Sequence, residues 1–276
     1  MNPPERRTVF FVSDRTGITA EMLGNSLLSQ FEEFNFQRET IPFVDTAEKI
    51  DAVLRRIDEI AKAEGRRPLV FSSIVNDTMS AQLGRANGLV LDLFGVFIAP
   101  LEGELKAKSS HTAGRSHGIA NSHEYFARIE AINFAQAHDD GASTRDLSKA
   151  QVILVGVSRC GKTPTTLYLA MQFGIRAANF PLTPDDFVDK KLPASVLPYR
   201  DRLFGLTINP ERLRQIRGER RPGSSYATLD NCRYEVREAE AMMQREAITM
   251  LDTTTKSIEE IATTVLHRAG LHRHAY

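Results

Sequence analysis

The stretch QVILVGVSRCGKTPTTLYLAMQFGI, Gln151 to Ile175, decides the fold of this chain. Its first residues are apolar and β-branched, which predicts a buried strand, and its last part has the pattern of a helix. Between them, GVSRCGKT (Gly156 to Thr163) matches G-x-x-x-x-G-K-[ST], and the flanking strand and helix are the context that supports a phosphate-binding loop. The sequence therefore predicts that a nucleotide-binding α/β domain begins in the middle of the chain.

Each fixed position of this loop has a chemical reason. Glycines let backbone N–H groups turn inward around a phosphate, and the following helix adds its partial positive charge. Lys162 is expected to reach the terminal phosphates as a catalytic residue, and the Thr163 hydroxyl is placed to help hold Mg²⁺. The residues predicted to bind the nucleotide are Gly156, Val157, Ser158, Arg159, Cys160, Gly161, Lys162 and Thr163. A glycine turn that binds nothing is the alternative.

The composition limits the whole chain. Its 276 residues, with 42% hydrophobic content, can bury one large core or two modest ones. A net charge of +0 gives no overall preference for nucleic acid or an anionic membrane. Cys160, one of two cysteines, lies in the loop, where a disulfide would obstruct a ligand. Because the longest apolar run is also short, we expect a cytoplasmic protein without nucleic-acid or membrane partners.

The first half of the chain predicts a second α/β unit. Its β-rich runs, at 8–14, 39–44 and 67–75, alternate with helical patterns at 18–31 and 47–65. Residues 88–101 are ambiguous between strand and helix, and Pro100 is expected to limit any helix there. A polar loop is expected over 106–124 and a further helix up to the Asp-Asp-Gly at 139–141. We therefore place one α/β domain at 1–146 and the phosphate-loop domain, expected to be kinase-like, at 147–276.

The phosphate-loop half predicts further strands and helices. Strands are expected at 176–182, 203–210 and 248–254, and a long helix at 225–246. The final helix is expected to begin with a capping box of Ser257 and Glu260 and to stop at Gly270. This alternation predicts an α/β domain around the loop.

Phosphoryl transfer also needs a carboxylate to hold the metal or to orient the nucleophile. Asp252 ends a predicted strand, where a metal-associated acid would be placed, although turn aspartates are equally common there. Asp139 and Asp140 lie beside the domain boundary; Asp140 is our candidate catalytic acid or base, and a plain turn is the alternative. Cys160 is expected to be inert, although Lys162 beside it would favour a reactive thiolate.

Basic residues could neutralise the developing charge. His111, His117 and His123 lack the compact spacing of a zinc site. His117, with Arg115 nearby, could instead contact phosphate and is a second catalytic candidate. The segment 210–225 predicts a mobile lid, a docking surface, or a solvated helix face on which Glu211 and Glu219 pair with arginines. Its arginines are Arg212, Arg214, Arg217, Arg220 and Arg221.

These residues by themselves leave several functions open. A GTPase is disfavoured because no N-K-x-D element follows the loop to recognise guanine. A small-molecule kinase of the adenylate or shikimate type would explain a lid but leaves half the chain unassigned. A nucleotide-gated binding module without catalysis also fits the motifs.

Five segments together resemble the family of pyruvate, phosphate dikinase and phosphoenolpyruvate synthase regulatory proteins. The resemblance spans nearly the whole chain, and the Lys-Thr-Pro that follows the loop glycine is uncommon in other phosphate-loop proteins. The segments are VFFVSDRTGITAE (9–21), GRSHG (114–118), HDDG (138–141), VILVGVSRCGKTPTTLYLAMQFGIRAANFPL (152–182) and LFGLTINPERL (203–213). Arg15 departs from the small residue usual in the first of them, which weakens any anion-binding role for that turn.

The resemblance implies a bifunctional enzyme that acts on another enzyme. Such a kinase uses ADP to phosphorylate a threonine near the catalytic histidine of its target, which inactivates the target. The phosphorylase activity removes that phosphate with inorganic phosphate and releases pyrophosphate. The loop sequence Arg-Cys-Gly-Lys-Thr-Pro is similar to that of synthase-directed members, so phosphoenolpyruvate synthase is the expected partner and the dikinase the alternative. A homo-oligomer is compatible with the sequence.

Overall fold

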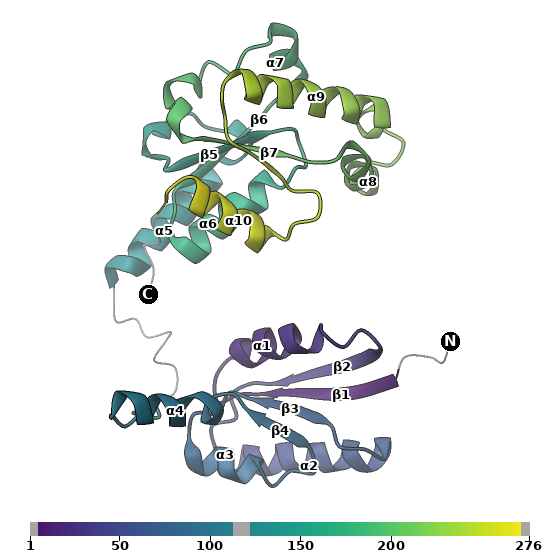
Figure 1. The fold of residues 1–276 in the computed structure, drawn as a ribbon, viewed down its shortest axis with the longest axis vertical. Helices are drawn as coiled ribbons and strands as arrows, with labels where there is room; N and C mark the ends of the chain where they lie inside the picture. Colours follow the sequence, from purple (N-terminus) through teal and green to yellow (C-terminus); the bar gives the residue numbers. More distant parts are fainter. Residues whose placement is uncertain (1–4, 113–121, 272–276) are drawn as a thin grey trace. The chain divides into compact units, whose positions relative to one another are not determined.

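The chain folds into two compact units, Met1–Gly118 and Ile119–Tyr276, each built around its own sheet (Figure 1). The structure is a computed structural model, and it describes residues 5–112 and 122–271. Within this described part, each unit contains a parallel sheet of four strands. The prediction of two α/β domains is confirmed at this level.

The first unit alternates strands and helices along the chain, as its sequence pattern predicts. Its sheet has the order β2-β1-β3-β4, with α1 on one face and α2 and α3 on the other (Figure 1). The elements are β1 (Glu5–Val12), α1 (Ile18–Leu28), β2 (Phe34–Ile41), α2 (Ala47–Glu64), β3 (Leu69–Ser72), α3 (Asp77–Leu83), β4 (Leu89–Asp92) and α4 (Gly95–Leu105).

Residue alternation along β1 produces the two layers of this unit. Phe11 packs with the residues beneath α1, whereas Phe10 and Val12 pack with those of α2. Because a strand places successive side chains on opposite faces, one continuous apolar run supplies both cores. The central strands β1 and β3 are therefore buried on both faces, whereas no residue of the outer strands β2 and β4 is fully buried.

The ambiguous segment 88–101 contains both a strand, β4, and the start of a helix, α4. The expectation that Pro100 limits a helix was wrong, because α4 runs through it to Leu105. Every residue of α4 keeps some exposure to solvent. The carbonyl that the proline leaves without its helical donor can therefore be hydrated, which makes the proline tolerable.

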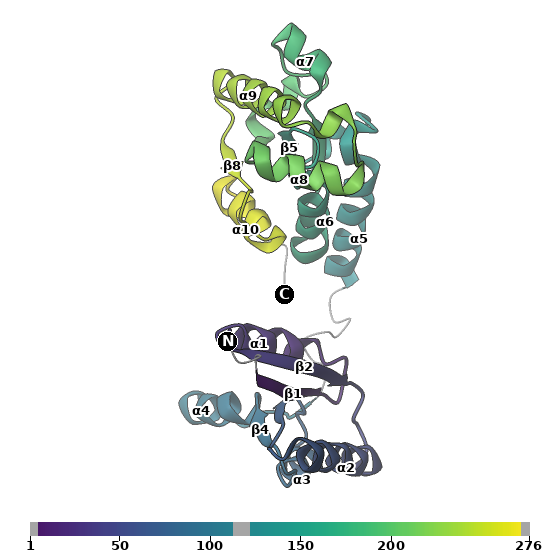
Figure 2. The same cartoon turned by 90° about the vertical axis from the view of Figure 1, so that its right-hand side faces the viewer.

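The second unit has the sheet order β6-β5-β7-β8. The helices α5 and α10 pack against α6 on one face, and α7 and α8 pack against α9 on the other (Figures 1 and 2). The elements are α5 (Ser122–Ala137), η2 (Asp139–Gly141), η3 (Leu147–Lys149), β5 (Val152–Gly156), α6 (Lys162–Phe173), β6 (Ala177–Pro181), α7 (Pro184–Asp189), η4 (Leu197–Arg202), β7 (Leu203–Thr207), α8 (Pro210–Arg220), η5 (Ser225–Ala227), α9 (Leu229–Arg245), β8 (Met250–Asp252) and α10 (Ile258–Arg268).

The helix α5 lies with the second unit, whereas the sequence pattern placed it before a boundary at residue 146. The division into units falls between Gly118 and Ile119 instead. Ala131 and Ala135 of α5 are buried together with Ala170 of α6, and such small side chains let two helices approach closely. This contact brings the Asp-Asp-Gly turn at the end of α5 to the phosphate loop at the start of α6.

The predicted start of α10 and the predicted end of α2 are confirmed. Ser257 Oγ accepts from the Glu260 N–H at 3.2 Å, and Glu260 Oε2 accepts from the Ser257 N–H at 2.8 Å, which forms the capping box of α10. Gly65 ends α2 with a φ of 65°. Within the described residues, no helix combines the length and apolar character that crossing a membrane requires.

Candidate functional site: a phosphate loop and its neighbours

The predicted strand, loop and helix are present around the glycine-rich motif. β5 ends at Gly156, the loop follows, and α6 begins at Lys162. Gly156 has a φ of 151°, and a Cβ atom there would lie 2.2 Å from the Leu206 carbonyl oxygen, so only glycine fits. Arg159 and Gly161 also have positive φ values, of 75° and 95°. The loop follows β5, which lies beside β7 in the sheet; between these two strands the connections turn to opposite sides, which is where ligands bind in open α/β sheets.

Lys162 is folded back over this loop. Its side chain is buried, and its Nζ donates to the Val157 carbonyl oxygen at 2.9 Å. A buried ammonium group in reach of only a few acceptors is a strong local positive charge. The Lys162 ammonium group is therefore placed to replace its hydrogen bond to the Val157 carbonyl oxygen with one to a phosphate oxygen.

Thr163 faces a carboxylate from the end of α5. Its Oγ1 donates to Asp139 Oδ1 at 2.7 Å, and the same oxygen accepts from the Asn179 side-chain amide. The Asn179 amide oxygen in turn accepts from the Asp140 N–H at 3.0 Å. No motif predicts a role for Asn179; its one signal in the sequence is a polar side chain in an otherwise apolar strand.

The two aspartates of the turn therefore have different environments. Asp139 is held by Thr163 and Asn179, whereas Asp140 is exposed, with a positive φ of 48°. Among the described residues, the Asp140 carboxylate has no hydrogen bond or ion pair. A plain turn does not explain why Asp139 is tied to the loop, and Asp140 stays available as an acid or base.

Asp252 is engaged in its own turn. Its Oδ1 accepts from the Thr254 N–H at 2.9 Å and from the Thr254 hydroxyl. The next residue, Thr253, contacts the loop instead: its Oγ1 donates to the Cys160 carbonyl oxygen at 3.1 Å. The turn interpretation of Asp252 is thus the one that the contacts favour.

The arginine-rich segment forms the helix α8, and its arginines are not equivalent. Arg217 is buried, while Arg212, Arg214, Arg220 and Arg221 are exposed. Glu211 and Glu219, whose pairing belongs to the alternative of a solvated helix face, have different kinds of partner. Glu211 pairs with Arg233 of α9 at 2.9 Å, and Glu219 accepts from Gln215 at 3.3 Å.

Of the histidines considered from the sequence, His111 is the one whose side chain the structure describes. His117 and Arg115 lie outside the described residues, so their predicted role stays a prediction. His111 lies in the first unit. Within the described residues, no group of three or more histidine, cysteine or acidic side chains is arranged to hold a metal ion.

Cys160, the buried cysteine of the loop, has a raised pKa, whereas reactive cysteines usually have a lowered one. Burial raises the pKa of Cys160, and the nearby Lys162 opposes this effect without overcoming it. Burial also raises the pKa of Cys232. Since the thiolate is the nucleophile, a raised pKa makes both thiols poorly reactive, in keeping with the inert role expected for Cys160.

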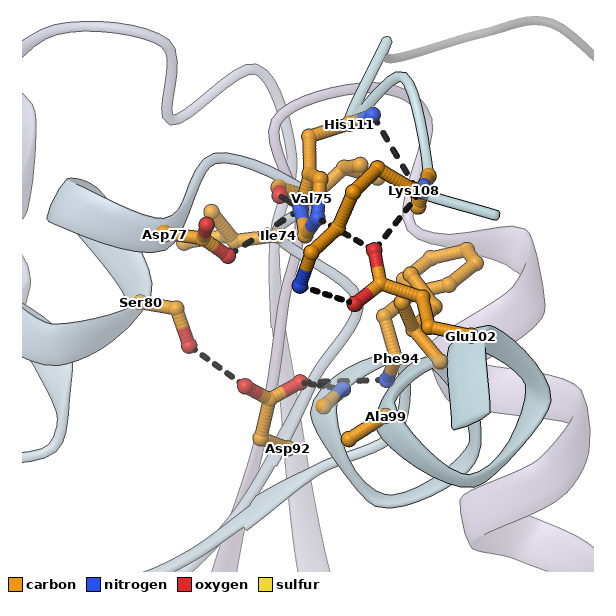
Figure 3. A pocket seen from close by; sticks show the side chains of 13 residues that line it. Ile74, Val75, Asp77, Ser80, Asp92, Phe94, Ala99, Glu102, Lys108 and His111 are labelled. Atoms are coloured by element: carbon orange, nitrogen blue, oxygen red, sulfur yellow. Dashed lines mark hydrogen bonds and ion pairs between the residues drawn. The ribbon is translucent and has the colours of Figure 1, made fainter. Parts of the chain in front are cut away.

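The first unit has a cavity of its own, of about 350 Å³, which the sequence analysis did not identify (Figure 3). In it, His111 lies between Asp77 and Glu102, and Ser80 donates to Asp92 at 2.6 Å. The Ser109 N–H, then Lys108 and His111, lower the pKa of Glu102. Asp92 and Glu102 also accept from main-chain N–H groups close to them in the chain, those of Phe94, Gly95 and Ser109.

Comparison with known proteins gives one consistent result. The family described as kinase/pyrophosphorylase matches residues 9–266. A protein of Bordetella parapertussis is 58% identical over 270 residues, which covers 98% of both chains. One of Burkholderia multivorans is 58% identical over 269 residues, covering 98% of this chain and 99% of its own. Both relatives bear the name of a phosphoenolpyruvate synthase regulatory protein.

Proposed function

The chain belongs to the kinase/pyrophosphorylase family, and from this premise we propose that it regulates phosphoenolpyruvate synthase by reversible threonine phosphorylation. The kinase activity transfers the β-phosphate of ADP to a threonine of the synthase and inactivates it. The pyrophosphorylase activity transfers that phosphate to inorganic phosphate and restores the synthase. The observation that carries the proposal is the loop that bears Lys162, with Asp139 and Asp140 beside it. The chain that contains this loop is 58% identical, over 98% of its length, to a relative named as a phosphoenolpyruvate synthase regulatory protein.

Both reactions move one phosphoryl group between a threonine oxygen and a phosphate oxygen, so one site can serve both. The loop N–H groups, the start of α6 and Lys162 supply positive charge that is in place before the reaction begins. In the kinase direction this charge stabilises the transferring phosphoryl group and the departing AMP. In the other direction the same groups bind inorganic phosphate and the pyrophosphate that forms. Gly156 to Thr163 are thus the proposed nucleotide and phosphate contacts.

Asp140 is the proposed general base of the kinase reaction. Its exposed carboxylate accepts the proton of the target threonine as the threonine oxygen attacks the β-phosphorus of ADP. In the phosphorylase direction the protonated carboxyl group returns that proton to the threonine oxygen as the oxygen leaves. Because Asp139 is already bonded to Thr163 and Asn179, Asp140 is the freer of the two carboxylates.

Thr163 and Asp139 fit a magnesium ion. A hydroxyl and a carboxylate in contact at the start of α6 are hard oxygen donors, and Mg²⁺ prefers few protein ligands together with phosphate oxygens and water. When bound, the ion would neutralise charge on the phosphates. Asp139 orients the Thr163 hydroxyl and Asn179 orients Asp139.

The first unit, Met1–Gly118, would present the target protein, a role that a metabolite kinase would not need. We further propose a cytoplasmic enzyme with no nucleic-acid or membrane partner. The alternative target is pyruvate, phosphate dikinase.

Transfer of label from β-labelled ADP to purified, histidine-phosphorylated phosphoenolpyruvate synthase tests the proposal. Labelled ATP and pyruvate, phosphate dikinase are the parallel tests. The expected result is labelled threonine on the synthase from ADP alone, which inorganic phosphate then releases as labelled pyrophosphate. Label on the dikinase alone would change the target. Transfer to neither protein, with turnover of small acceptors, would replace the proposal with a metabolite kinase.

A further inference from the structure

One arginine of the second unit is buried to a degree that is unusual for a charged side chain. The Arg217 side chain is 0% exposed, and its Nη2 lies 2.6 Å from Glu235 Oε2 on α9. Glu235 Oε1 accepts from the Asn231 side chain at 2.8 Å, so both carboxylate oxygens are used. Burying such an ion pair contributes little net stability, because the desolvation of both charges offsets their attraction. A role other than stability is therefore needed to explain it.

The same guanidinium holds the phosphate loop from outside. Nη2 also donates to the Ser158 carbonyl oxygen at 3.1 Å, and Nη1 donates to the Tyr226 carbonyl oxygen at 3.1 Å. The guanidinium carbon lies 3.9 Å from the centre of the Tyr226 ring. The Tyr226 hydroxyl donates to Ser158 Oγ at 2.8 Å, so Ser158 is held at both its main chain and its side chain.

Arg217 Nε is the one fully buried side-chain nitrogen or oxygen, among the described residues, that has no hydrogen-bond partner. Leaving a buried N–H unpaired is unfavourable. A shorter or apolar side chain would avoid this cost, but it could not reach Ser158, Tyr226 and Glu235 together. The fork of the guanidinium suits this set of three acceptors.

The orientation of one peptide group links these contacts to ligand binding. In a trans peptide the C=O and the next N–H point in opposite directions. Because Arg217 holds the Ser158 carbonyl on the outer side of the loop, the Arg159 N–H is directed to the inner side. The positive φ of Arg159 belongs to the backbone arrangement in which successive N–H groups form an anion-binding concavity.

A second anchor acts in the same way two residues later. The Thr253 hydroxyl lies 3.1 Å from the Cys160 carbonyl oxygen and 2.9 Å from the Thr207 carbonyl oxygen, so its one proton is shared between them. The contact with Cys160 directs the Gly161 N–H inward. Thr253 is itself placed by the edge of the sheet, since its N–H donates to the Thr207 carbonyl oxygen at 2.9 Å. Alternate peptides of the loop are thus held by two different elements, α8 and the end of β8.

We propose that Arg217, with Thr253 as a second anchor, is a positioning residue that holds the Ser158 and Cys160 carbonyls outward and so presents the loop N–H groups to phosphate. The inference rests on the proposed function in that it assumes phosphate binding at this loop. It adds that α8 acts on the loop through one buried arginine, in place of a lid that closes over the ligand. Since one loop serves both reactions, losing an anchor weakens ADP and inorganic phosphate together.

The test replaces the buried ion pair without leaving a lone charge. In the double variant Arg217→Met/Glu235→Leu we expect a folded protein by circular dichroism, with the Kd of ADP and the KM of inorganic phosphate both raised at least tenfold. The matched control is Arg237→Met/Glu238→Leu, the same exchange at an exposed ion pair on α9, which should leave both values unchanged. Arg217→Lys keeps a cation opposite Glu235 but not the fork, and should give an intermediate rise.

Thr253→Val tests the second anchor in a nearly isosteric variant and does not depend on whether the double variant folds. We expect it to raise both values several-fold, with a smaller change in kcat than in KM. Wild-type affinity for ADP and phosphate in folded Arg217→Lys and Thr253→Val proteins would overturn the inference and leave the proposed function intact. Failure of the wild-type chain to bind ADP would instead refute the proposed function, and the inference with it.

Discussion

The Thr163 hydroxyl donates a hydrogen bond to Asp139 at 2.7 Å, which joins the first turn of α6 to the end of α5. Both groups are oxygen donors of the kind that Mg²⁺ accepts. The contact exists because α5 packs along α6 and ends beside the loop. It distinguishes the two neighbouring aspartates, since Asp139 is bonded whereas the Asp140 carboxylate has no partner among the described residues.

Asp139→Asn should weaken the use of magnesium without unfolding the protein. The amide keeps the size of the side chain but removes the negative charge that faces Thr163. We expect the Mg²⁺ concentration for half-maximal kinase activity to rise at least tenfold. The control is Asp146→Asn, an exposed aspartate of the same segment that pairs with Lys149. An unchanged magnesium requirement in Asp139→Asn would remove Asp139 from the metal site.

Asp140→Asn should reduce kcat and leave nucleotide binding intact. A positioned general base contributes roughly 10²- to 10⁴-fold to such reactions, and an amide cannot take the proton of the threonine. Rapid-quench measurement of kcat and calorimetric measurement of ADP binding separate the two effects. A wild-type kcat, or a loss confined to ADP affinity, would show that Asp140 is not the base.

Lys162→Ala should abolish both activities. Lys162 is the buried positive charge of the loop, and removing a preorganised charge-stabilising donor typically reduces kcat by about 10²- to 10³-fold or more. The forward and reverse reactions are assayed on the same preparation, with the exposed Lys190→Ala as the control. Full phosphorylase activity in Lys162→Ala would contradict a single shared site.

Gly156→Ala should destabilise the second unit. The added Cβ would meet the Leu206 carbonyl oxygen at 2.2 Å, and the φ of 151° is one that side chains rarely adopt. Strain and overpacking together predict a loss of about 2–5 kcal/mol in the free energy of unfolding. Gly218→Ala, in the middle of α8 with open space around it, should instead gain about 0.5–1 kcal/mol. Urea denaturation of both variants measures the contrast, and equal stabilities would show that the loop backbone adapts.

The two cysteines should not react with thiol reagents in the native protein at pH 8. Burial raises the pKa of both thiols, so the reactive thiolate is scarce at a pH below their ordinary value, and reagents have little access. Ellman's reagent should therefore detect two thiols per chain only after unfolding in urea. Rapid labelling of Cys160 in the native protein, located by mass spectrometry, would disagree with its burial.

Much of the local structure could be predicted from the sequence. The strand, loop and helix around Gly156 to Thr163, the capping box of α10 and the glycine that ends α2 all follow from residues close together in the chain. Each depends on the hydrogen bonds and periodicity of a few neighbouring residues, and these act wherever the segment lies. Pro100 is the exception, because the exposure of α4, a property of the fold, makes an internal proline tolerable.

The candidate site was only partly predictable. The sequence identified the loop and the Asp139–Asp140 pair, but not which aspartate contacts Thr163 or that Asn179 holds it in place. The segment around Arg217 is plainly arginine-rich, yet its one buried arginine cannot be told from the exposed ones by sequence. Residue type and spacing do not show which side of a helix meets a distant loop.

The sequence by itself therefore determined the chemistry that this protein carries: a phosphate loop, its lysine and threonine, nearby carboxylates and two α/β units. Only the tertiary structure decided which of these groups contact one another. Thr163 meets Asp139 because α5 packs on α6, and Ser158 meets Arg217 because α8 packs on α9 beside the loop. Local hydrogen bonding and periodicity are encoded in short stretches, whereas these pairings join residues 24 and 59 positions apart and exist only after the layers have packed.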